Sequence, residues 1–589
     1  MGLLDRLFKL GENQTTVTTE LRAGLVTFLT MSYIIFVQPI ILSGVGLSWH
    51  TVFVATCVAS AVATLLMAFF ANYPIALAPA MGHNVLFFTL CREGVINWQT
   101  GLGAVFVSGT IFLVMSFWGI REKIVNAVPS ALKHAIAVGI GILIAFLGFQ
   151  WAGVAVDNPA TLVQRGDLHL TPVLLALGGL LLTASLIALR VRGAILIGIL
   201  ATAAAGIPLG ITSTKQIENE GVFVLPSPAP QPVLAWHVPD VVEAHVPGLR
   251  SAFKAGAAEH YDAARVIGRE KVDAAAGEAG HALDRKTDEA QVLRLAEQLG
   301  AGLVLFPVLD PADGPGEQAT LQAVAFRIQE KQGKKTAKVW RAYHAVPTSA
   351  CPADLERYAR DVMLGLPGHN GLFQLDVIGA IEVGILHVVF VFLFLDLFDT
   401  IGTLIGVSEQ AGLLREGKLP RARGALLSDA CGTVIGAGLG TSTVTSYIES
   451  SAGVAEGART GLANIVTALL FLAALFFSPL VRMIGAASEV STAAGTLHLY
   501  PAVAPVLIII GSIMLRNVVH VQWSEPTEAI PAFIAIMMMP LTFSITDGIA
   551  FGFITYAFLK LITGRGREVH WLVYLFAVLF LVRYAYVRF

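Results

Sequence analysis

Long apolar segments alternate with short polar loops along most of this chain. Because a helix needs ~20 apolar residues to cross a bilayer, the pattern predicts seven spans before residue 213 and seven after residue 376. The first set lies near residues 22–43, 51–71, 74–90, 101–119, 131–149, 171–189 and 194–212. The second set lies near residues 377–411, 424–438, 441–456, 462–480, 500–515, 527–545 and 547–563. A further apolar stretch at 570–587 fits either an interfacial helix or a fifteenth span.

The fold class predicted from this pattern is an all-α polytopic membrane protein with one soluble insert. Residues 213–376 hold 38 of the 80 Lys, Arg, Asp and Glu residues, so this segment is expected to lie in water. Its helix, strand and hairpin patterns predict a small α/β domain at about 236–366, either a passive domain or a binding domain without an assigned partner. The predicted units are 1–212, the first seven-span half; 213–376, the insert; 377–563, the second half; and 564–589, a tail.

The basic residues predict the orientation. With a cytoplasmic N-terminus, seventeen Lys and Arg residues fall on the cytoplasmic side and three in short loops opposite, as expected when basic loops remain inside. The insert 213–376 is then extracytoplasmic. The first residues, MGLLDRLFKLGENQTT, lack the apolar run of a signal peptide. Because seven is odd, the second half must enter the membrane from the opposite side, which predicts an inverted repeat.

Composition excludes several classes of protein. Charged residues make up 14% of the chain and the net charge is -2, which argues against a nucleic-acid partner. Four scattered cysteines form neither a disulfide framework nor a metal-ligand spacing, and no cofactor motif is present. We therefore expect no metal site, no cofactor and no enzymatic activity.

Three acidic residues lie deep within apolar segments: Asp396, Asp399 and Glu449. An ionisable side chain at that depth costs at least ~2.5 kcal/mol, so it normally faces a cavity, a partner or a transported ligand. Asp396 and Asp399 share one helix face, and Thr400 follows Asp396 by one turn. These side chains predict a polar site inside the membrane, although hydrogen bonds between helices are the structural alternative for each.

Two segments are poor continuous helices. Residues 74–88 begin with two prolines close together, and residues 440–457 are rich in β-favouring Thr and Val. Each predicts an extended stretch that leads into a half-helix, and they are the third span of each half. Interrupted spans at matching positions indicate a transport site near the midplane. Glu449 is expected at the start of the second half-helix, with free backbone N–H groups on Ser450 and Ser451 for a ligand.

Asn84 is a further candidate for substrate binding, and His83, Thr400 and Asp429 are secondary candidates. Asn84 fits either a ligand contact or a helix cap, and His83 beside it could titrate near neutral pH. Asp429 fits a structural role near the cytoplasmic end of its helix.

The strings ALAPAMGHN, DLFDTIGTLIGV and GTSTVTSYIESSAGVAEGARTGL resemble the AzgA-type purine permeases of the nucleobase-cation symporter superfamily. The resemblance covers nearly all the chain outside the insert. It implies a fourteen-span fold of core and gate domains, proton-coupled import of hypoxanthine, guanine or adenine across the bacterial inner membrane, and a homodimer. It also implies substrate binding by Asn84, Asp396, Asp399 and Glu449. The residues themselves make Ser450 a further candidate for substrate binding, and they make Asp396 and Glu449 the candidates for proton coupling, because the pKa of a carboxyl group rises when it loses water.

Two other functions remain open from the residues themselves. An anion exchanger or channel of the same fold would need a positively charged site, which the buried acids oppose. A receptor that senses through the insert would not need carboxylates at membrane depth. The preferred purine, the choice of proton or sodium as coupling ion and the role of the insert are not determined by the sequence.

Overall fold

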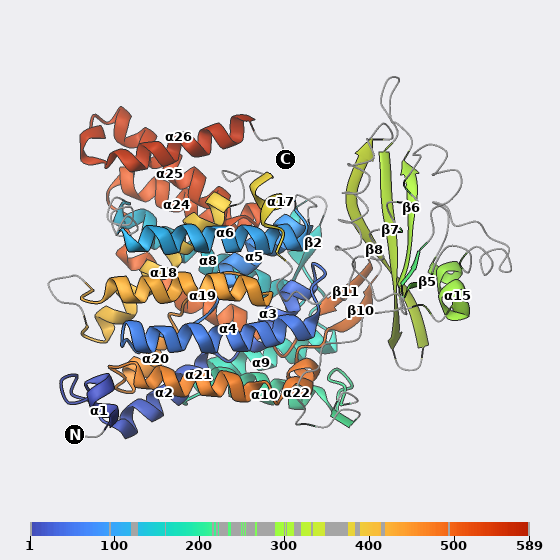
Figure 1. Ribbon diagram of the computed structural model, residues 1–589, viewed down its shortest axis with the longest axis horizontal. Coiled ribbons are helices and arrows are strands. Elements are labelled where there is room, and N and C mark those ends of the chain that lie inside the picture. Colours follow the sequence, from blue (N-terminus) through green and yellow to red (C-terminus); the bar gives the residue numbers. More distant parts are fainter. Residues whose placement is uncertain are drawn as a thin grey trace.

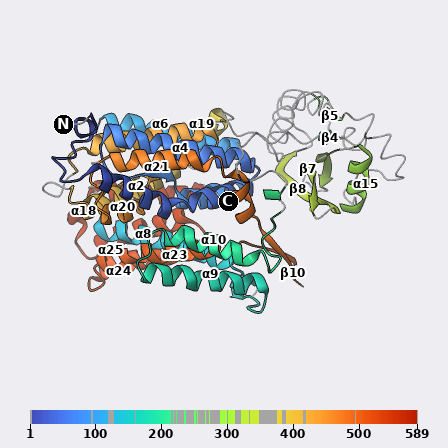
Figure 2. The same ribbon diagram turned by 90° about the horizontal axis from the view of Figure 1, so that it is seen from below.

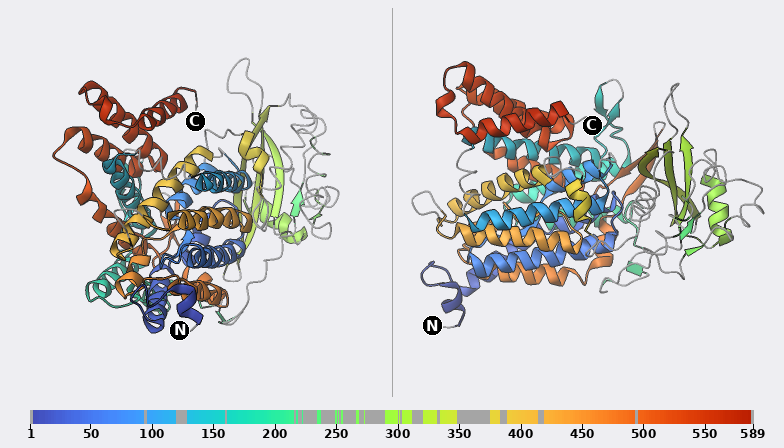
Figure 3. Two further views of the ribbon diagram at one scale, coloured as in Figure 1. Left: turned by 60° about the vertical axis from the view of Figure 1, so that its left-hand side comes forward. Right: turned by 45° about the horizontal axis from the view of Figure 1, so that its top comes forward.

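The structure of the chain is a computed structural model. Outside the insert it describes residues 3–92, 96–118, 128–158, 161–214, 375–382, 389–413, 419–492 and 495–586. Within 215–374 it describes residues 217–218, 222, 234–236, 249, 251, 254, 266–267, 272, 289–299, 301, 303–310, 320–331 and 334–347. Helices that run side by side form one body, and a β-rich region lies beyond one end of them (Figure 1). Figure 3 shows this arrangement from two further directions.

Apolar helices account for most of the chain before the insert. The first apolar segment is two helices, because the chain turns at Ser32 and Tyr33 between α2 and α3. Pro39 lies inside α3, where it cannot donate a backbone hydrogen bond. The helices are α1 (Leu3–Phe8), α2 (Val17–Met31), α3 (Ile34–Ser43), α4 (Trp49–Phe70), α5 (Met81–Arg92), α6 (Trp98–Phe117), α8 (Ser130–Trp151), α9 (Thr171–Ala188) and α10 (Ala194–Gly206).

A second series of helices follows the insert. It contains α17 (Val377–Glu382), α18 (Phe390–Gln410), α19 (Ala422–Leu439), α20 (Ser450–Ala455), α21 (Leu462–Ala474), α22 (Ser478–Ile484), α23 (Ala504–Met514), α24 (Pro526–Thr542), α25 (Ile545–Ile562) and α26 (Trp571–Tyr586). Two short 3-10 helices are η3 (Leu515–His520) and η4 (Gly566–Glu568).

Two short strands lie inside the helical body. β1 (Leu77–Pro79) leads into α5, and β9 (Val444–Ser446) leads toward α20. They pair antiparallel, with Ala78 opposite Thr445, and all their residues are buried. Proline favours an extended residue before it, and β-branched residues favour strands. The prediction of an extended stretch before each short helix is confirmed.

The helices fall into two groups. Seen from below, α4, α6, α19 and α21 lie on one side and α8, α9, α10, α23, α24 and α25 on the other (Figure 2). α5 and α18 contact α8, so these two helices lie where the groups meet. The strand pair β1–β9 is beside them, because α18 also contacts β9.

Several helices have the length and composition of membrane spans. Among the described residues the long apolar helical segments are Val17–Ser43, which comprises α2 and α3, and the helices Trp49–Phe70, Trp98–Ser116, Ser130–Trp151, Thr171–Ala188 and Ile545–Ile562. Shorter apolar helices are Met81–Cys91, Ala194–Gly206, Leu462–Ala474, Ala504–His520, Pro526–Thr542 and Trp571–Val582. A polytopic helical body is therefore confirmed, whereas the count of fourteen spans stays a prediction.

The insert contains a five-stranded sheet in the order β5-β4-β6-β7-β8. Strand β4 pairs in parallel with both β5 and β6. Strand β7 pairs antiparallel with β6 on one side and with β8 on the other. The helix α15 (Glu289–Leu299) packs on β7 and β8. The predicted helix, strand and hairpin are present, and the predicted helix at 352–365 lies outside the described residues. The strands are β4 (Leu234–Trp236), β5 (Val266–Ile267), β6 (Leu303–Asp310), β7 (Thr320–Lys331) and β8 (Lys334–Pro347).

Two hairpins extend from the helical body. They are β2 (Ala155–Asn158) with β3 (Leu162–Arg165), and β10 (Ser488–Thr492) with β11 (Gly495–Leu499). Both lie at the end of the body that faces the β-rich insert (Figure 1).

Helices α2 and α21 approach each other closely. A Cβ atom on Gly24 would lie 2.3 Å from the carbonyl oxygen of Ala463. The buried Glu20 carboxylate accepts the backbone N–H groups of Arg459, at 2.8 Å, and Ala463, at 3.2 Å. This carboxylate lies where the first N–H groups of α21 lack helical partners, so it stabilises the start of that helix.

Replacing Gly24 with alanine should therefore destabilise the protein. We expect Gly24→Ala to lower the melting temperature in detergent, because overpacking of this kind costs about 1–3 kcal/mol. Gly178→Ala on α9 is the matched control, because no atom lies within 4 Å of its added Cβ position. A Gly24→Ala protein that melts at or above the wild-type temperature would contradict the close packing of α2 on α21.

Candidate functional site

Acidic side chains from three helices gather beside the strand pair. Asp396 and Asp399 lie on α18, Asp429 lies on α19, and Glu449 is the N-terminal capping residue of α20. Helix α18 contacts β9 and α20, while α19 contacts both β1 and β9. The strand pair therefore brings residues that are far apart in the sequence into one region of the interior.

Thr400 joins two of these carboxyl groups. Its Oγ1 lies 3.2 Å from Oδ1 of Asp396 and 2.8 Å from Oδ1 of Asp429. All three residues are fully buried. A hydroxyl group carries one hydrogen, so Thr400 donates to one carboxylate at a time. The second contact is a hydrogen bond only when the other carboxyl group is protonated and donates to the Thr400 oxygen.

Asp399 lies one helical turn after Asp396 on α18 and is partly exposed. Its Oδ2 accepts a hydrogen bond of 3.4 Å from Oγ1 of Thr445 on β9. Asp429 and Glu449 are the acidic groups that interact electrostatically with it. Asp399 therefore interacts electrostatically with an acid of the buried Asp396–Thr400–Asp429 group and with Glu449.

Glu449 is held by a residue from the break between α2 and α3. Oε1 of Glu449 accepts a hydrogen bond of 2.9 Å from the hydroxyl of Tyr33. Tyr33 is buried and its ring lies 6.4 Å from the ring of Tyr447. The Tyr447 hydroxyl donates to the carbonyl oxygen of Pro79 at the end of β1. The two tyrosines therefore join α3, β1 and the start of α20.

The expected free backbone N–H groups next to Glu449 are not present. The N–H of Ser450 donates to the Tyr447 carbonyl oxygen at 3.2 Å, and the N–H of Ser451 donates to that of Ile448 at 2.9 Å. The prediction was wrong because residues 447–449 already form a helical turn before α20, which supplies carbonyl partners. Oγ of Ser450 accepts the N–H of Ala76 at 3.0 Å, so this side chain supports the segment that leads into β1.

Asn84 belongs to a separate network of amides and hydroxyls. Its Nδ2 donates to Oε1 of Gln38, and its Oδ1 accepts from Oγ of Ser442. Nε2 of Gln38 donates to Oγ1 of Thr441 at 2.8 Å. Asn84, Gln38, Thr441 and Ser442 are all fully buried. The network connects α3, α5 and the residues before β9. Within the part of the chain that the structure describes, the side chain of Asn84 bonds to amide, hydroxyl and thioether groups.

His83 precedes Asn84 on α5 and is fully buried. Its ring is stacked against that of Phe392 on α18, with centroids 6.3 Å apart. The structure therefore places His83 at the contact of α5 with α18.

Sequence reasoning did not identify Gln38, Tyr33 or Tyr447. Gln38 carried a usable signal, because it is a polar residue within the apolar run IIFVQPII, where an amide at membrane depth needs a partner. The tyrosines carried none, since an aromatic residue in an apolar segment is usually part of the core.

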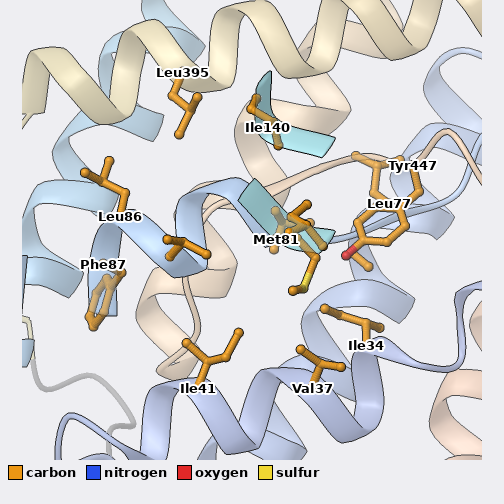
Figure 4. Packing of buried hydrophobic residues seen from close by; sticks show 14 of the residues in the cluster. Ile34, Val37, Ile41, Leu77, Met81, Leu86, Phe87, Ile140, Leu395 and Tyr447 are labelled. Carbon is orange, nitrogen blue, oxygen red and sulfur yellow. The ribbon is translucent and has the colours of Figure 1, made fainter. Parts of the chain in front are cut away.

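Apolar side chains surround the site. Ile34 and Val37 of α3 lie on one side of Leu77 and Met81, and Leu395 of α18 lies on the other (Figure 4). Such surroundings exclude water and strengthen electrostatic interactions among the polar groups. Among the described residues, no group of three or more His, Cys, Asp or Glu side chains is arranged to hold a metal ion.

Comparison with known proteins gives the family. A model of the Permease family matches residues 18–238 and 364–551. The chain is 35% identical to the guanine/hypoxanthine permease PbuO of Bacillus subtilis, over 98% of this chain and 99% of that protein. It is 32% identical to the adenine permease AdeP of Escherichia coli, over 100% of this chain and 97% of that protein.

Two more distant similarities complete the comparison. The nucleobase transporter PlAzg2 of Paenibacillus larvae is 25% identical over 91% of this chain and 76% of that protein. Among solved structures, the transmembrane domain of the cyanobacterial bicarbonate transporter BicA is similar at 11% identity and a TM-score of 0.45, over 90% of this chain and 97% of that one.

The motif resemblance is confirmed by these matches, which are to transport proteins rather than enzymes. The apolar helices and the full-length similarity to permeases also identify a multi-pass membrane protein. The chain belongs to the Permease family, together with bacterial permeases for guanine, hypoxanthine and adenine.

Proposed function

We propose that this protein imports purine nucleobases by symport with protons across the bacterial cytoplasmic membrane. The observation that carries the proposal is the set of carboxyl groups beside the β1–β9 pair, within an apolar helical body. Charged groups at that depth are costly unless they face partners or a transported ligand. The guanine, hypoxanthine and adenine in the names of the relatives supply the substrate class.

Purine recognition is assigned to Asp399, Glu449 and Asn84, and also to Asp396, which lies one turn before Asp399 on α18. A purine has N–H donors that suit carboxylate oxygens and ring nitrogens that suit amide donors. Asp399 and Glu449 are partly exposed, which supports direct contact with a ligand. Tyr33 occupies one oxygen of Glu449, so the second can accept from the base. The second amide hydrogen of Asn84 points to the sulfur of Met81 at 3.9 Å, a weak acceptor that a base could replace.

Proton coupling is assigned to Asp396 and Glu449, with Asp429 as the partner of Asp396. The geometry around Thr400 supports this role, because both of its short contacts are satisfied only when Asp396 and Asp429 share a proton. A proton held between two buried carboxyl groups can leave when water or a ligand changes their surroundings. Asp429 then takes part in proton coupling, whereas its position in the sequence favoured a structural role.

The proposed topology has fourteen spans in two inverted halves, 1–212 and 377–563. A cytoplasmic N-terminus and an extracytoplasmic segment 213–376 are supported by the excess of seventeen basic residues over three on the cytoplasmic side. The strand–helix units β1–α5 and β9–α20 occupy the third position of each half. A homodimer is proposed from the family resemblance, and the insert has no proposed partner.

The other functions have less support. An anion exchanger would bind its substrate with positive charge, yet the charged side chains that meet beside β9 are Asp396, Asp399, Asp429 and Glu449. A receptor that senses through the insert gives no reason for these acids.

Uptake of labelled bases tests the proposal directly. We expect cells that lack their own purine transporters to accumulate hypoxanthine, guanine or adenine, but not uracil, and an uncoupler should abolish accumulation. Glu449→Gln and Asp396→Asn should each abolish concentrative uptake while expression is retained. Glu409→Gln, on an exposed position of α18, is the matched control. Accumulation by either site variant at the wild-type level would remove that residue from the mechanism.

Asn84→Ala should weaken purine binding by roughly 5- to 150-fold, the effect of about 1–3 kcal/mol for an unpaired buried polar group. If Asn84 contacts the base directly, its loss should change the ranking of competing purines. Gln38→Ala removes a network partner of Asn84 and should weaken all purines alike. Unchanged inhibition constants in both variants would reduce this network to a structural role.

Thr400→Val keeps the side-chain shape and removes the hydroxyl between Asp396 and Asp429. We expect it to lower proton-driven accumulation at least tenfold, while binding measured in detergent changes less. Thr400→Ser keeps the hydroxyl and should retain most of the accumulation. Equal accumulation by the valine variant and the wild type would exclude Thr400 from proton coupling.

A further inference from the structure

The last helix, α26, runs back along α25 over its whole length. Near the start of α25, the Tyr584 hydroxyl donates to Oδ1 of Asp547 at 2.6 Å. In the middle, the ring of Phe553 lies 5.9 Å from that of Phe576 and 6.2 Å from that of Phe580. The residues of α26 nearer its end thus contact the residues of α25 nearer its start. This order of contacts is that of two antiparallel helices.

The figures agree with this register. α26 lies beside α25, and its last turn lies toward the end of the helical body that is nearer the insert, whereas α1 lies at the opposite end (Figures 1 and 3). The η4 turn, which carries Arg565, Arg567 and Glu568 in and beside it, connects the two helices at the other end.

The surface of α26 is apolar on both faces. The face toward α25 contains the buried Val573, Phe576, Ala577 and Phe580. The opposite face carries Trp571, Leu575, Val578 and Val582 at helical spacing, with exposed fractions of 63, 40, 55 and 44%. No charged residue occurs in 571–582. An interfacial helix needs a charged or polar face toward water, and α26 has none over this stretch.

Its length fits a membrane span. The 16 residues of α26 extend over ~24 Å and the 18 of α25 over ~27 Å, close to the ~30 Å hydrocarbon thickness. Because α25 is apolar and long enough to cross the bilayer, a helix packed along all of it must cross the same layer.

We propose that α26 is an additional membrane span whose outer face lies against lipid acyl chains, so that the residues after it lie on the opposite side of the membrane from the η4 turn. Lipid is favoured over a second copy of the chain because exposed apolar side chains also occur on the neighbouring α25 and on α24, at Phe558 with 58% and Leu541 with 64% exposure. Together with the fourteen proposed spans, α26 makes fifteen, and the two ends of the chain face opposite sides.

Cysteine labelling tests the crossing. The four native cysteines are replaced by alanine in a variant that retains uptake, and one cysteine is added either after Phe589 or at Arg567 in the exposed η4 turn. A membrane-impermeant maleimide should label these two positions from opposite sides of the membrane. Labelling of both from the same side would overturn the proposal.

Spin-label accessibility tests the occupant of the outer face. Val578→Cys carries the label on the exposed face, and Ala577→Cys on the face toward α25 is the control. We expect high accessibility to oxygen and low accessibility to a water-soluble nickel complex at 578, with low values for both at 577. Low values for both reagents at 578 would assign the face to a second copy, and high nickel accessibility would place the helix at the interface; either result contradicts lipid contact.

Discussion

The pairing of β1 with β9 is the interaction on which the site depends. Two extended segments inside an apolar body would leave backbone N–H and C=O groups without partners, and each such group costs several kcal/mol away from water. Pairing satisfies part of this requirement and fixes which residues lie opposite each other. It also helps to determine where α5 and α20 begin, because α5 starts two residues after β1 and α20 follows β9 after the turn at 447–449.

Side chains supply further partners for this pair and for the residues before β1. Oγ1 of Thr64 both donates to and accepts from the backbone of Leu77, while Nδ2 of Asn464 donates to the carbonyls of Tyr73 and Ile75. Oγ1 of Thr433 donates to the Val444 carbonyl at 2.9 Å. These contacts come from α4, α19 and α21, so one side of the helical body holds both strands in place. The acids of α18 and α19 then meet beside a rigid support.

The sequence predicted this region in outline. Acidic residues in apolar segments and two segments unsuited to continuous helices were readable, because membrane depth makes polar residues and helix breaks conspicuous. The link from Thr400 to Asp429 was not readable, because it joins two helices whose rotation about their axes no local pattern specifies. The free N–H groups expected on Ser450 and Ser451 are absent, because both groups donate to carbonyls of the turn before α20, which no local sequence pattern predicted.

A proton shared between Asp396 and Asp429 through Thr400 is the central claim, and infrared spectroscopy of the purified protein measures it most directly. A protonated carboxyl group gives a C=O stretching band that is separate from carboxylate bands and shifts in D2O. At neutral pH the wild-type protein should show this band, and it should be lost or shifted in Asp396→Asn, in Asp429→Asn and in Thr400→Val. A spectrum without a protonated-carboxyl band, or with a band unchanged in all three variants, would contradict the shared proton.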